Sequence, residues 1–542
     1  MSRQDPIKME KQHMLVYENN EKLVIKNVSD ECEETLTLSK VLGTGSFKGN
    51  NENDVFKCSY KILGVYGMLC LGENSYVIFV TKSAKIARIA SYPVYEIREV
   101  LIKELLIKNT KGTNDAFLLK RAQDFFKNPG IMYSKFPLYS SNMDPENTDF
   151  IFNYNLIGML KSHVRGSVSS YVIRAIYGSF QYIDFEQFSI VLISRRSWKN
   201  VGARFIRRGL NREKEAANSI ETEQYVILSG DEEPTNSFLQ LRGSIPLYWK
   251  QDLTYKYRPI IKIVKTNPLK EYDTKLCKKY KNVFYLNLIQ NVGYESGLNK
   301  IYISRLADNC LKYLHFDFVR ERLLVDYSKK LQLLCLISPQ LQRNGFCDSR
   351  SAQKGIIRTN CVDSLDRTNV VQFFIAEEVL ASQLKSLKLR KDTIPEFEAK
   401  YKNMWVKNGN MLSYQYSGTN ALGAEVVLHG RQNIKGALVD FYNSGVRYFL
   451  NRFYHGDLQT SYDVVSGNYR HLKIAKRKKY FNFSHFFLVF FASVAYSSYY
   501  MFDSVNFPRE LLVYFLISCF VVPILYPFIA RYCFNYPYFE SD

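Results

Sequence analysis

The feature that most constrains this chain is a single loop in which Cys361 and Arg367 are separated by five residues. Residues 355–357 predict a short buried strand that enters the loop. Thr368 and the apolar run 370–380 predict a helix that leaves it, with Thr368 as the N-cap. A strand, a tight loop and a helix N-terminus form an anion site, because backbone N–H groups and the helix dipole point inward. The loop therefore predicts an α/β unit with a phosphate site at the end of a strand.

The residue types in this loop suit a phosphatase that uses a cysteine nucleophile. Only the thiolate attacks, and both a helix N-terminus and a nearby guanidinium favour it. We expect Arg367 to hold two phosphate oxygens in a fork. Asp363 or Asp366 would protonate the leaving alcohol and then activate the water that hydrolyses the phosphocysteine. Asp363 is preferred because it lies two residues from Cys361, whereas Asp366 could instead orient Arg367. This chemistry needs no metal and no other cofactor.

The spacing alone has an ordinary alternative, a buried thiol beside a surface arginine. The chain has 10 cysteines, but only Cys361 has an arginine six residues later, and it alone stands at a predicted strand–helix junction. No Cys-x2-Cys pair occurs, so the cysteines give little support to a zinc site. Their scattered positions are typical of a protein in a reducing cytosol.

The whole string Arg-Thr-Asn-Cys-Val-Asp-Ser-Leu-Asp-Arg-Thr-Asn, residues 358–369, resembles the signature of the Sac-domain (suppressor-of-actin) phosphoinositide phosphatases. The family usually has a second cysteine at the position of Ser364, but the attack needs only the first. The resemblance implies that Cys361, Asp363 and Arg367 remove a phosphate from an inositol lipid headgroup. The phosphate or substrate contacts that we expect come from Val362, Ser364, Leu365, Asp366, Thr368 and Arg242.

Further strings between about residues 55 and 470 resemble the same family, among them 194–197, 202–204, 207–209, 221–224, 242–249, 287–290, 314–318, 415–422 and 440–444. Arg204, Arg207, Arg208 and Arg212 by themselves predict a solvated basic face, whereas the resemblance favours a surface that meets acidic headgroups. Two departures concern headgroup contacts. Asn410 stands where an aspartate is common, and the run 427–433 is less basic than usual.

Composition and patterning predict a folded α/β protein with a β-rich N-terminal part. Hydrophobic residues make up 46% of the chain, with 40 Tyr and 37 Phe. Residues 60–71 and 76–82 predict strands joined by a turn, and 96–108 predict a helix. We expect an N-terminal Sac subdomain at 1–180 and an α/β catalytic domain at 181–470. Residues 471–542 would hold a basic juxtamembrane link, a transmembrane hairpin and a short tail.

The hairpin is predicted from two apolar segments, 483–502 and 511–530, which follow a cluster of Lys and Arg at 473–479. Each has about 20 residues, which matches a hydrocarbon core of about 30 Å. The basic cluster should stay cytosolic, and the catalytic domain with it. Members of the family anchored in this way lie in the endoplasmic reticulum and Golgi. The resemblance therefore implies a two-span protein of those membranes with phosphatidylinositol 4-phosphate as its leading substrate.

The net charge of +21 predicts an anionic partner, and composition alone does not choose among nucleic acid, an acidic membrane surface and a phosphorylated ligand. The resemblance favours a phosphoinositide lipid and an anionic membrane surface over nucleic acid, and it predicts no particular protein partner. A catalytically weak phosphoinositide-binding membrane protein is the alternative. A protein tyrosine phosphatase is disfavoured, because Asn360 replaces the usual histidine before the cysteine and the loop contains no glycine.

Overall fold

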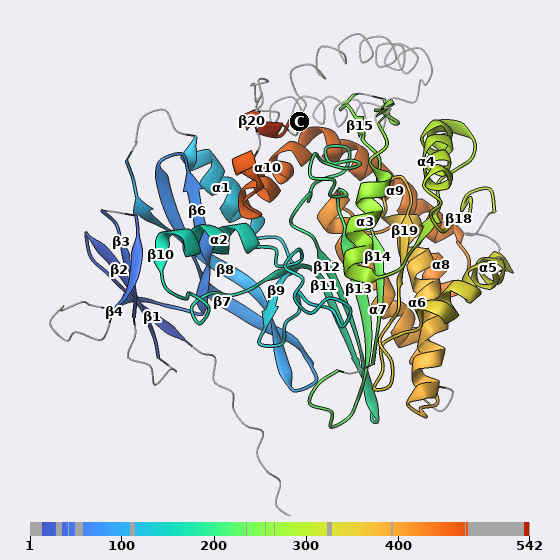
Figure 1. Cartoon of the computed structure of the whole chain (residues 1–542), viewed down its shortest axis with the longest axis horizontal. Coiled ribbons are helices and arrows are strands. Elements are labelled where there is room, and N and C mark those ends of the chain that lie inside the picture. The colour runs from blue at the N-terminus through green and yellow to red at the C-terminus, as the bar shows by residue number, and fades with distance from the viewer. Residues whose placement is uncertain are drawn as a thin grey trace, which may run out of the picture.

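The computed structural model describes residues 13–28, 35–41, 43–48, 58–108, 114–234, 236–254, 256–264, 266–321, 328–391, 394–471, 473–474 and 536–540. A six-stranded sheet lies at the N-terminal end of the molecule (Figure 1). Its strand order is β10-β4-β3-β2-β1-β5, and every neighbouring pair except β10 and β4 is antiparallel. The strands are β1 Met14–Glu18, β2 Lys22–Asn27, β3 Thr35–Ser39, β4 Gly45–Lys48, β5 Cys58–Ile62 and β10 Val164–Arg165.

An eleven-stranded sheet runs through the rest of the fold in the order β18-β17-β19-β14-β13-β12-β11-β9-β8-β7-β6. Its antiparallel strands are β6 Gly64–Leu71, β7 Asn74–Ile89, β8 Tyr92–Leu106, β9 Ile131–Ser134, β11 Ile176–Asp184, β12 Phe188–Arg196, β13 Ile220–Leu228 and β14 Asn236–Arg242. Beyond β14 the sheet continues in parallel with β19 Ile356–Asn360, β17 Val283–Asn287 and β18 Tyr313–His315. Two short pairs complete the strands: β15 Trp249–Gln251 with β16 Ile261–Ile263, and β20 Lys473–Ile474 with β21 Phe539–Glu540.

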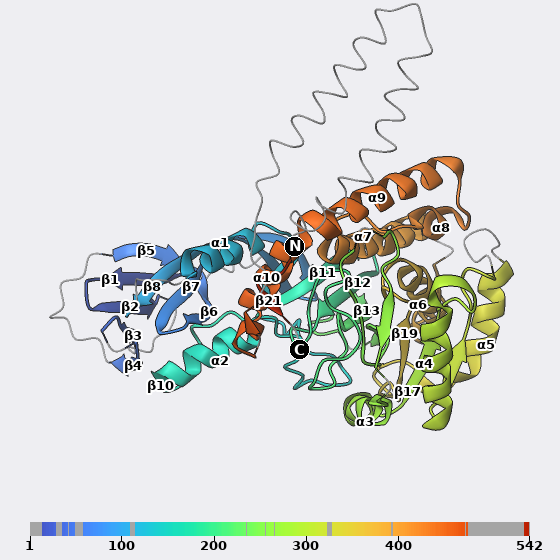
Figure 2. The same ribbon diagram turned by 90° about the horizontal axis from the view of Figure 1, so that it is seen from above.

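Helices cover both faces of the parallel part of the large sheet (Figure 2). One apolar core joins the sheet to α5 Ser328–Asn344, α6 Asp366–Ser386 and α7 Phe397–Ser417, and another joins its other face to α3 Leu269–Tyr280 and α4 Ser296–Asp308. Near α7 lie α8 Ala424–His429 and α9 Ile434–Phe453. The N-terminal core holds α1 Asp115–Phe125, α2 Tyr154–His163 and α10 His455–Val465, and the 3-10 turns are η1 Gly293–Glu295 and η2 Asn468–His471.

The structure confirms the mixed α/β class with a β-rich N-terminal part. The strands predicted at 60–71 and 76–82 correspond to parts of β5, β6 and β7. The boundary predicted at residue 180 falls inside β11, which pairs with β9 on one side and β12 on the other. Residue 180 thus marks no break in the sheet, and the division into subdomains stays a prediction.

The helix predicted at 96–108 is wrong, because most of this segment belongs to β8. Its partner β7 has 16 residues and pairs with it from Ile89 opposite Tyr92 to Ser75 opposite Leu106. This long antiparallel ladder satisfies the backbone of both strands and outweighs the local helix preference of the segment.

The prediction of a two-span protein of endoplasmic reticulum or Golgi membranes is contradicted, and we correct it. In the part of the chain that the structure describes, none of the helices combines the length and the apolar character needed to cross a bilayer. With 21 residues each, α6 and α7 reach about 30 Å, but charged residues such as Asp366 and Lys400 interrupt them. The segments 483–502 and 511–530 lie outside the described residues.

The burial of His455, the first residue of α10, predicts that the folded chain loses stability in acid. Its side chain is 2% exposed, and burial with the nearby charge of Arg204 lowers its pKa from 6.5 to about 3. Below about pH 6.5 this histidine therefore binds a proton in the unfolded chain but not in the folded chain. We expect the free energy of unfolding to fall by about 2 kcal/mol between about pH 6.5 and pH 5. Urea unfolding at several pH values measures this, and His455→Leu should flatten the profile. An equally steep profile in the variant would assign the effect to other groups.

Candidate active site

The Cys361 loop lies between the parallel strand β19 and helix α6, as the sequence predicts. The helix begins at Asp366, so Thr368 lies inside its first turn and is not the N-cap. Ser364 holds the loop in a tight turn: its φ is 49°, and its hydroxyl donates to the carbonyl oxygens of Gly243 at 2.5 Å and Cys361 at 3.2 Å. A serine in the left-handed region is strained, and such strain is concentrated at functional loops.

The sulfur of Cys361 is nearly covered, since the residue is 2% exposed. The Thr368 hydroxyl donates to it at 3.5 Å, and the loop residues Val362 and Leu365 are also buried. Arg242 lies at the end of β14, where it pairs with Thr359 of β19. Burial lowers the pKa of Arg242 to about 9, and the charge of an ionised Cys361 acts in the opposite direction.

The Arg242 guanidinium is fully buried and donates to the Asn369 side chain. Its Nε and Nη2 atoms have no hydrogen-bond partner among the described residues. A buried cation with free donors can act as the partner of a negative charge that forms at Cys361 or on a bound phosphate. The structure thus brings Arg242 near Cys361, but Arg242 is not among the residues that line the cavity.

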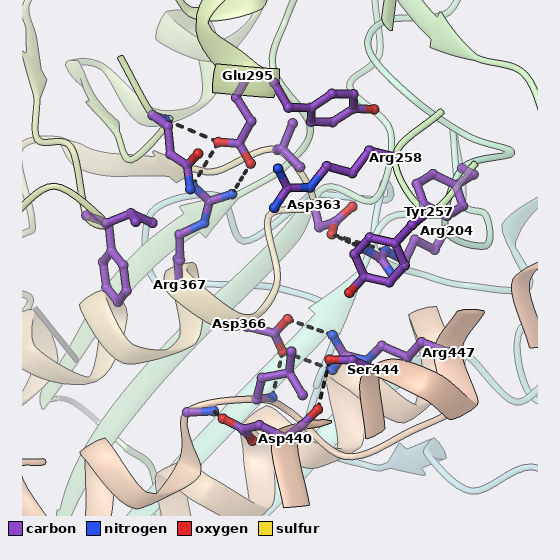
Figure 3. Close-up of a pocket in the computed structure, with 18 of the residues that line it drawn as sticks. Arg204, Tyr257, Arg258, Glu295, Asp363, Asp366, Arg367, Asp440, Ser444 and Arg447 are labelled. Carbon is purple, nitrogen blue, oxygen red and sulfur yellow. Dashed lines mark hydrogen bonds and ion pairs between the residues drawn. The ribbon is translucent and has the colours of Figure 1, made fainter. Parts of the chain in front are cut away.

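Asp363 points into a cavity and is held by two arginines from the segment after β12 (Figure 3). Arg204 Nη2 lies 2.9 Å from its Oδ2, and Arg208 Nη2 lies 2.6 Å from its Oδ1. Arg208 also donates to the Val362 carbonyl oxygen at 3.2 Å. Burial raises the pKa of Asp363, but the two guanidinium groups outweigh burial and leave this pKa well below its usual range. Asp363 is therefore a carboxylate in this state.

Arg367 is held in the same cavity by a carboxylate fork. Its Nη2 lies 2.5 Å from Oε1 of Glu295, and its Nη1 donates to Oε2 at 2.9 Å and to the Leu288 carbonyl oxygen at 3.1 Å. Burial lowers the pKa of Arg367, but the charges of Cys361 and Glu295 outweigh it and raise the pKa above its usual value. A bidentate carboxylate occupies the donors that would also bind two phosphate oxygens.

Asp366 connects α6 to α9, and among the described residues its carboxylate bonds to Arg447 and the Leu422 backbone and not to Arg367. Arg447 donates to its two oxygens at 2.7 and 3.0 Å, and the Leu422 backbone N–H donates at 2.8 Å. Arg447 is 2% exposed and also donates to Ser413 and Thr419. These bonds fit a carboxylate that supports the loop from the helix side.

The cavity has a volume of about 340 Å³, within the range of small-ligand sites. It is rich in charge, with five arginines and four carboxylates among its lining residues: Arg204, Arg208, Arg258, Arg367, Arg447, Glu295, Asp363, Asp366 and Asp440. Val362 also lines it, whereas Cys361 and Arg242 do not. Most of the arginines are paired with carboxylates, so an entering anion would compete with existing partners.

The predicted solvated basic face is wrong for two of its four arginines. Arg207 and Arg208 are each 7% exposed, and Arg207 forms an ion pair with Asp463 at 2.8 Å. Sequence patterns assigned no role to Glu295, Arg447, Tyr257 or Arg258. Glu295 has the opposite charge to Arg367, and Arg447 has the opposite charge to Asp366. This opposite charge is the signal that could have suggested them as partners. Asn410 supports the backbone, because its Oδ1 accepts from the Ala421 N–H at 3.0 Å.

Comparison of this sequence with known proteins shows a family model and relatives that it resembles. Residues 63–322 match the family model of the SacI homology domain, a region that ends before the Cys361 loop. The chain is 31% identical over 456 residues to phosphoinositide phosphatase SAC6 of Arabidopsis thaliana, which covers 75% of each chain. It is 30% identical to SAC7 of the same plant, over 75% of this chain and 74% of the relative. Phosphatidylinositol-3-phosphatase SAC1 of Saccharomyces cerevisiae is 29% identical, over 80% and 75% of the two chains.

Proposed function

Because this chain belongs to the SacI homology domain family of phosphoinositide phosphatases, we propose that it removes a phosphate monoester from a phosphoinositide headgroup. The observation that carries the proposal is the Cys361 loop, fixed between β19 and α6 beside a cavity lined with arginines. Phosphatidylinositol 4-phosphate is the leading substrate, although the name of the yeast relative points to the 3-phosphate.

The headgroup phosphate binds by replacing carboxylates as the hydrogen-bond partner of the cavity arginines. A phosphate dianion carries more charge than one carboxylate, so it competes well for the donors of Arg367 and of Arg204 and Arg208. As the phosphate draws these two arginines from Asp363, the cause of its lowered pKa weakens and the carboxyl can take up a proton. Substrate binding thereby converts Asp363 from a paired carboxylate into a proton donor.

The reaction then proceeds in two displacements at phosphorus. The Cys361 thiolate forms a bond to phosphorus while the bond from phosphorus to the inositol oxygen breaks, and Asp363 gives its proton to that oxygen. Asp363, now a carboxylate, takes a proton from water as the water oxygen attacks phosphorus and the sulfur leaves as a thiolate. Inorganic phosphate is released. Arg367 and Arg242 stabilise the charges of the transferring group and of the sulfur.

An isomer panel tests this function. We expect the purified full chain, with a chelator present, to release phosphate several-fold faster from phosphatidylinositol 4-phosphate than from the 3- or 5-phosphate. Phosphate release is followed colorimetrically, and a phosphotyrosine peptide serves as the comparison substrate. Faster hydrolysis of the peptide than of any lipid would contradict the proposal.

Binding without turnover is the second candidate function. Two observations favour it: Cys361 is 2% exposed and does not line the cavity. If every isomer binds but none is hydrolysed, the chain is a phosphoinositide-binding protein and not an enzyme. The same panel separates the two functions when binding of each isomer is measured beside phosphate release.

A further inference from the structure

One face of α9 carries large apolar side chains that are mostly exposed. Ile434, Leu438, Phe441 and Tyr442 are 83%, 66%, 80% and 70% exposed. Their spacing of four, seven and eight residues from Ile434 places them along one side of the helix. Among the described residues, Ile434 and Phe441 are the most exposed of all the large hydrophobic side chains. Surface helices usually turn such residues toward the core, so this arrangement indicates a docking surface.

The neighbouring face of the same helix lines the candidate active site. Asp440, Ser444 and Arg447 also follow helical spacing, and all three line the cavity (Figure 3). Phe441 is next to Asp440 in sequence and lies one turn before Ser444. Whatever covers the apolar face of α9 therefore lies beside the cavity.

Three further segments bring exposed apolar side chains to the cavity. Tyr257 and Ile260 between β15 and β16 are each 60% exposed, and Tyr257 lines the cavity. Val319 is 49% exposed and lines it too, while Val292, 70% exposed, stands two residues before the lining residue Tyr294. We call these four residues, with Ile434, Leu438, Phe441 and Tyr442 of α9, the apolar rim.

Contacts with α9 hold the β15–β16 part of the rim in place. Tyr257 stacks on Tyr448 of α9, with ring centroids 6.2 Å apart and planes at 16°. Arg452 of α9 donates to the carbonyl oxygens of Thr254 at 2.9 Å and Lys256 at 2.7 Å. Two parts of the rim that are distant in sequence thus form one supported surface.

Basic residues accompany the rim. Lys256, Arg258, Arg431 and Lys435 are exposed next to its apolar residues, and Arg258 lines the cavity with its guanidinium 5.9 Å from the Tyr294 ring centroid. Exposed apolar side chains mixed with lysine and arginine are typical of surfaces that enter the boundary between headgroups and acyl chains of an anionic bilayer.

We propose that the apolar rim inserts into the surface of an anionic lipid bilayer and sets the cavity over a headgroup. The inference rests on the proposed function for the identity of the substrate. A bilayer fits this surface better than a protein partner or a second copy of the chain. A protein seated beside the cavity would obstruct its mouth, whereas a bilayer supplies the substrate there. Insertion would also shorten the distance that the headgroup must move out of the membrane to enter the cavity.

The test removes apolar contact without touching a cavity residue. We expect Phe441→Ser combined with Leu438→Ser in the full chain to weaken binding to vesicles of phosphatidylcholine, phosphatidylserine and phosphatidylinositol 4-phosphate by about tenfold or more. Hydrolysis in the same vesicles should fall in parallel. Hydrolysis of a short-chain, water-soluble phosphatidylinositol 4-phosphate should be unchanged. Leu331→Ser on α5, where the leucine is 60% exposed, is the matched control and should leave vesicle binding unaltered.

Each other outcome has a definite meaning. Vesicle binding equal to that of the unmutated chain would overturn the inference. So would a change in oligomeric state with unaltered vesicle binding, because a second copy would then cover the rim. If the unmutated chain hydrolyses neither substrate, the proposed function fails, but loss of vesicle binding in the variant would still support the rim.

Discussion

Replacing Cys361 with serine should reduce phosphate release by at least about a thousandfold, because a serine hydroxyl is not ionised at neutral pH. The change is nearly isosteric, and the Thr368 hydroxyl, 3.5 Å from the sulfur, can donate to a serine oxygen as well. We therefore expect the unfolding midpoint to stay close to that of the unmutated chain. Initial rates with a phosphoinositide substrate, together with thermal unfolding, measure both effects.

Cys277→Ser is the matched control for this prediction. Burial and the nearby Asp273 raise the pKa of Cys277 to about 11, so its thiol stays protonated at neutral pH. Its replacement should leave the rate unchanged. The nucleophile would have to be another group if Cys361→Ser retained full activity in a folded protein. A covalent phosphate label trapped on the unmutated chain, absent after the Cys361 change, would identify the intermediate directly.

The sequence predicted the Cys361 loop well because its residues are neighbours in the chain. Strand, loop and helix follow one another, and backbone geometry alone places them. The sequence did not predict which residues pair with the side chains of the loop. Arg204 and Arg208 meet Asp363 across 159 and 155 residues, and Glu295 meets Arg367 across 72. Such pairs depend on the order of strands in the large sheet, which local patterns do not specify.

Two local predictions failed for related reasons. Thr368 is a good N-cap residue, but the loop turns at Ser364 and the helix starts at Asp366, so the threonine hydroxyl donates to the sulfur of Cys361. Residues 96–108 combine helix-forming residues with branched apolar ones, and pairing with the 16-residue strand β7 selects the strand. In both cases contacts made by distant residues outweigh local preference.

Asp363→Asn should lower the free energy of unfolding by about 3 kcal/mol at neutral pH. Removing the carboxylate leaves Arg204 and Arg208 without their partner, and an unpaired buried charge costs about 3–5 kcal/mol. We expect the lower end of this range, because side-chain exposures of 13% for Asp363 and 21% for Arg204 admit some water. Urea unfolding measures the change, and Asp184→Asn, at a carboxylate that is 56% exposed, should cost far less.

The pH dependence of this loss identifies its cause. The pKa of Asp363 is lowered in the folded chain, so its ion pairs stabilise the fold fully above about pH 4, the usual pKa of an aspartate. The contribution is lost as the pH falls from there toward the lowered pKa. The stabilities of the unmutated chain and of Asp363→Asn should therefore converge below about pH 4. A constant difference at all pH values would mean that the asparagine disturbs packing and not charge.

The same variant should lose at least about a hundredfold in rate on an inositol lipid, since the inositol alkoxide leaves poorly without a proton donor. An aryl phosphate has a leaving group that needs no proton, so its hydrolysis by Asp363→Asn should fall much less. This contrast separates a missing acid from a damaged site, because distortion of the loop by two unpaired arginines would slow both substrates alike. If Asp366→Asn shows the contrast and Asp363→Asn does not, the proton donor is Asp366, and its pairing with Arg447 must open when substrate binds.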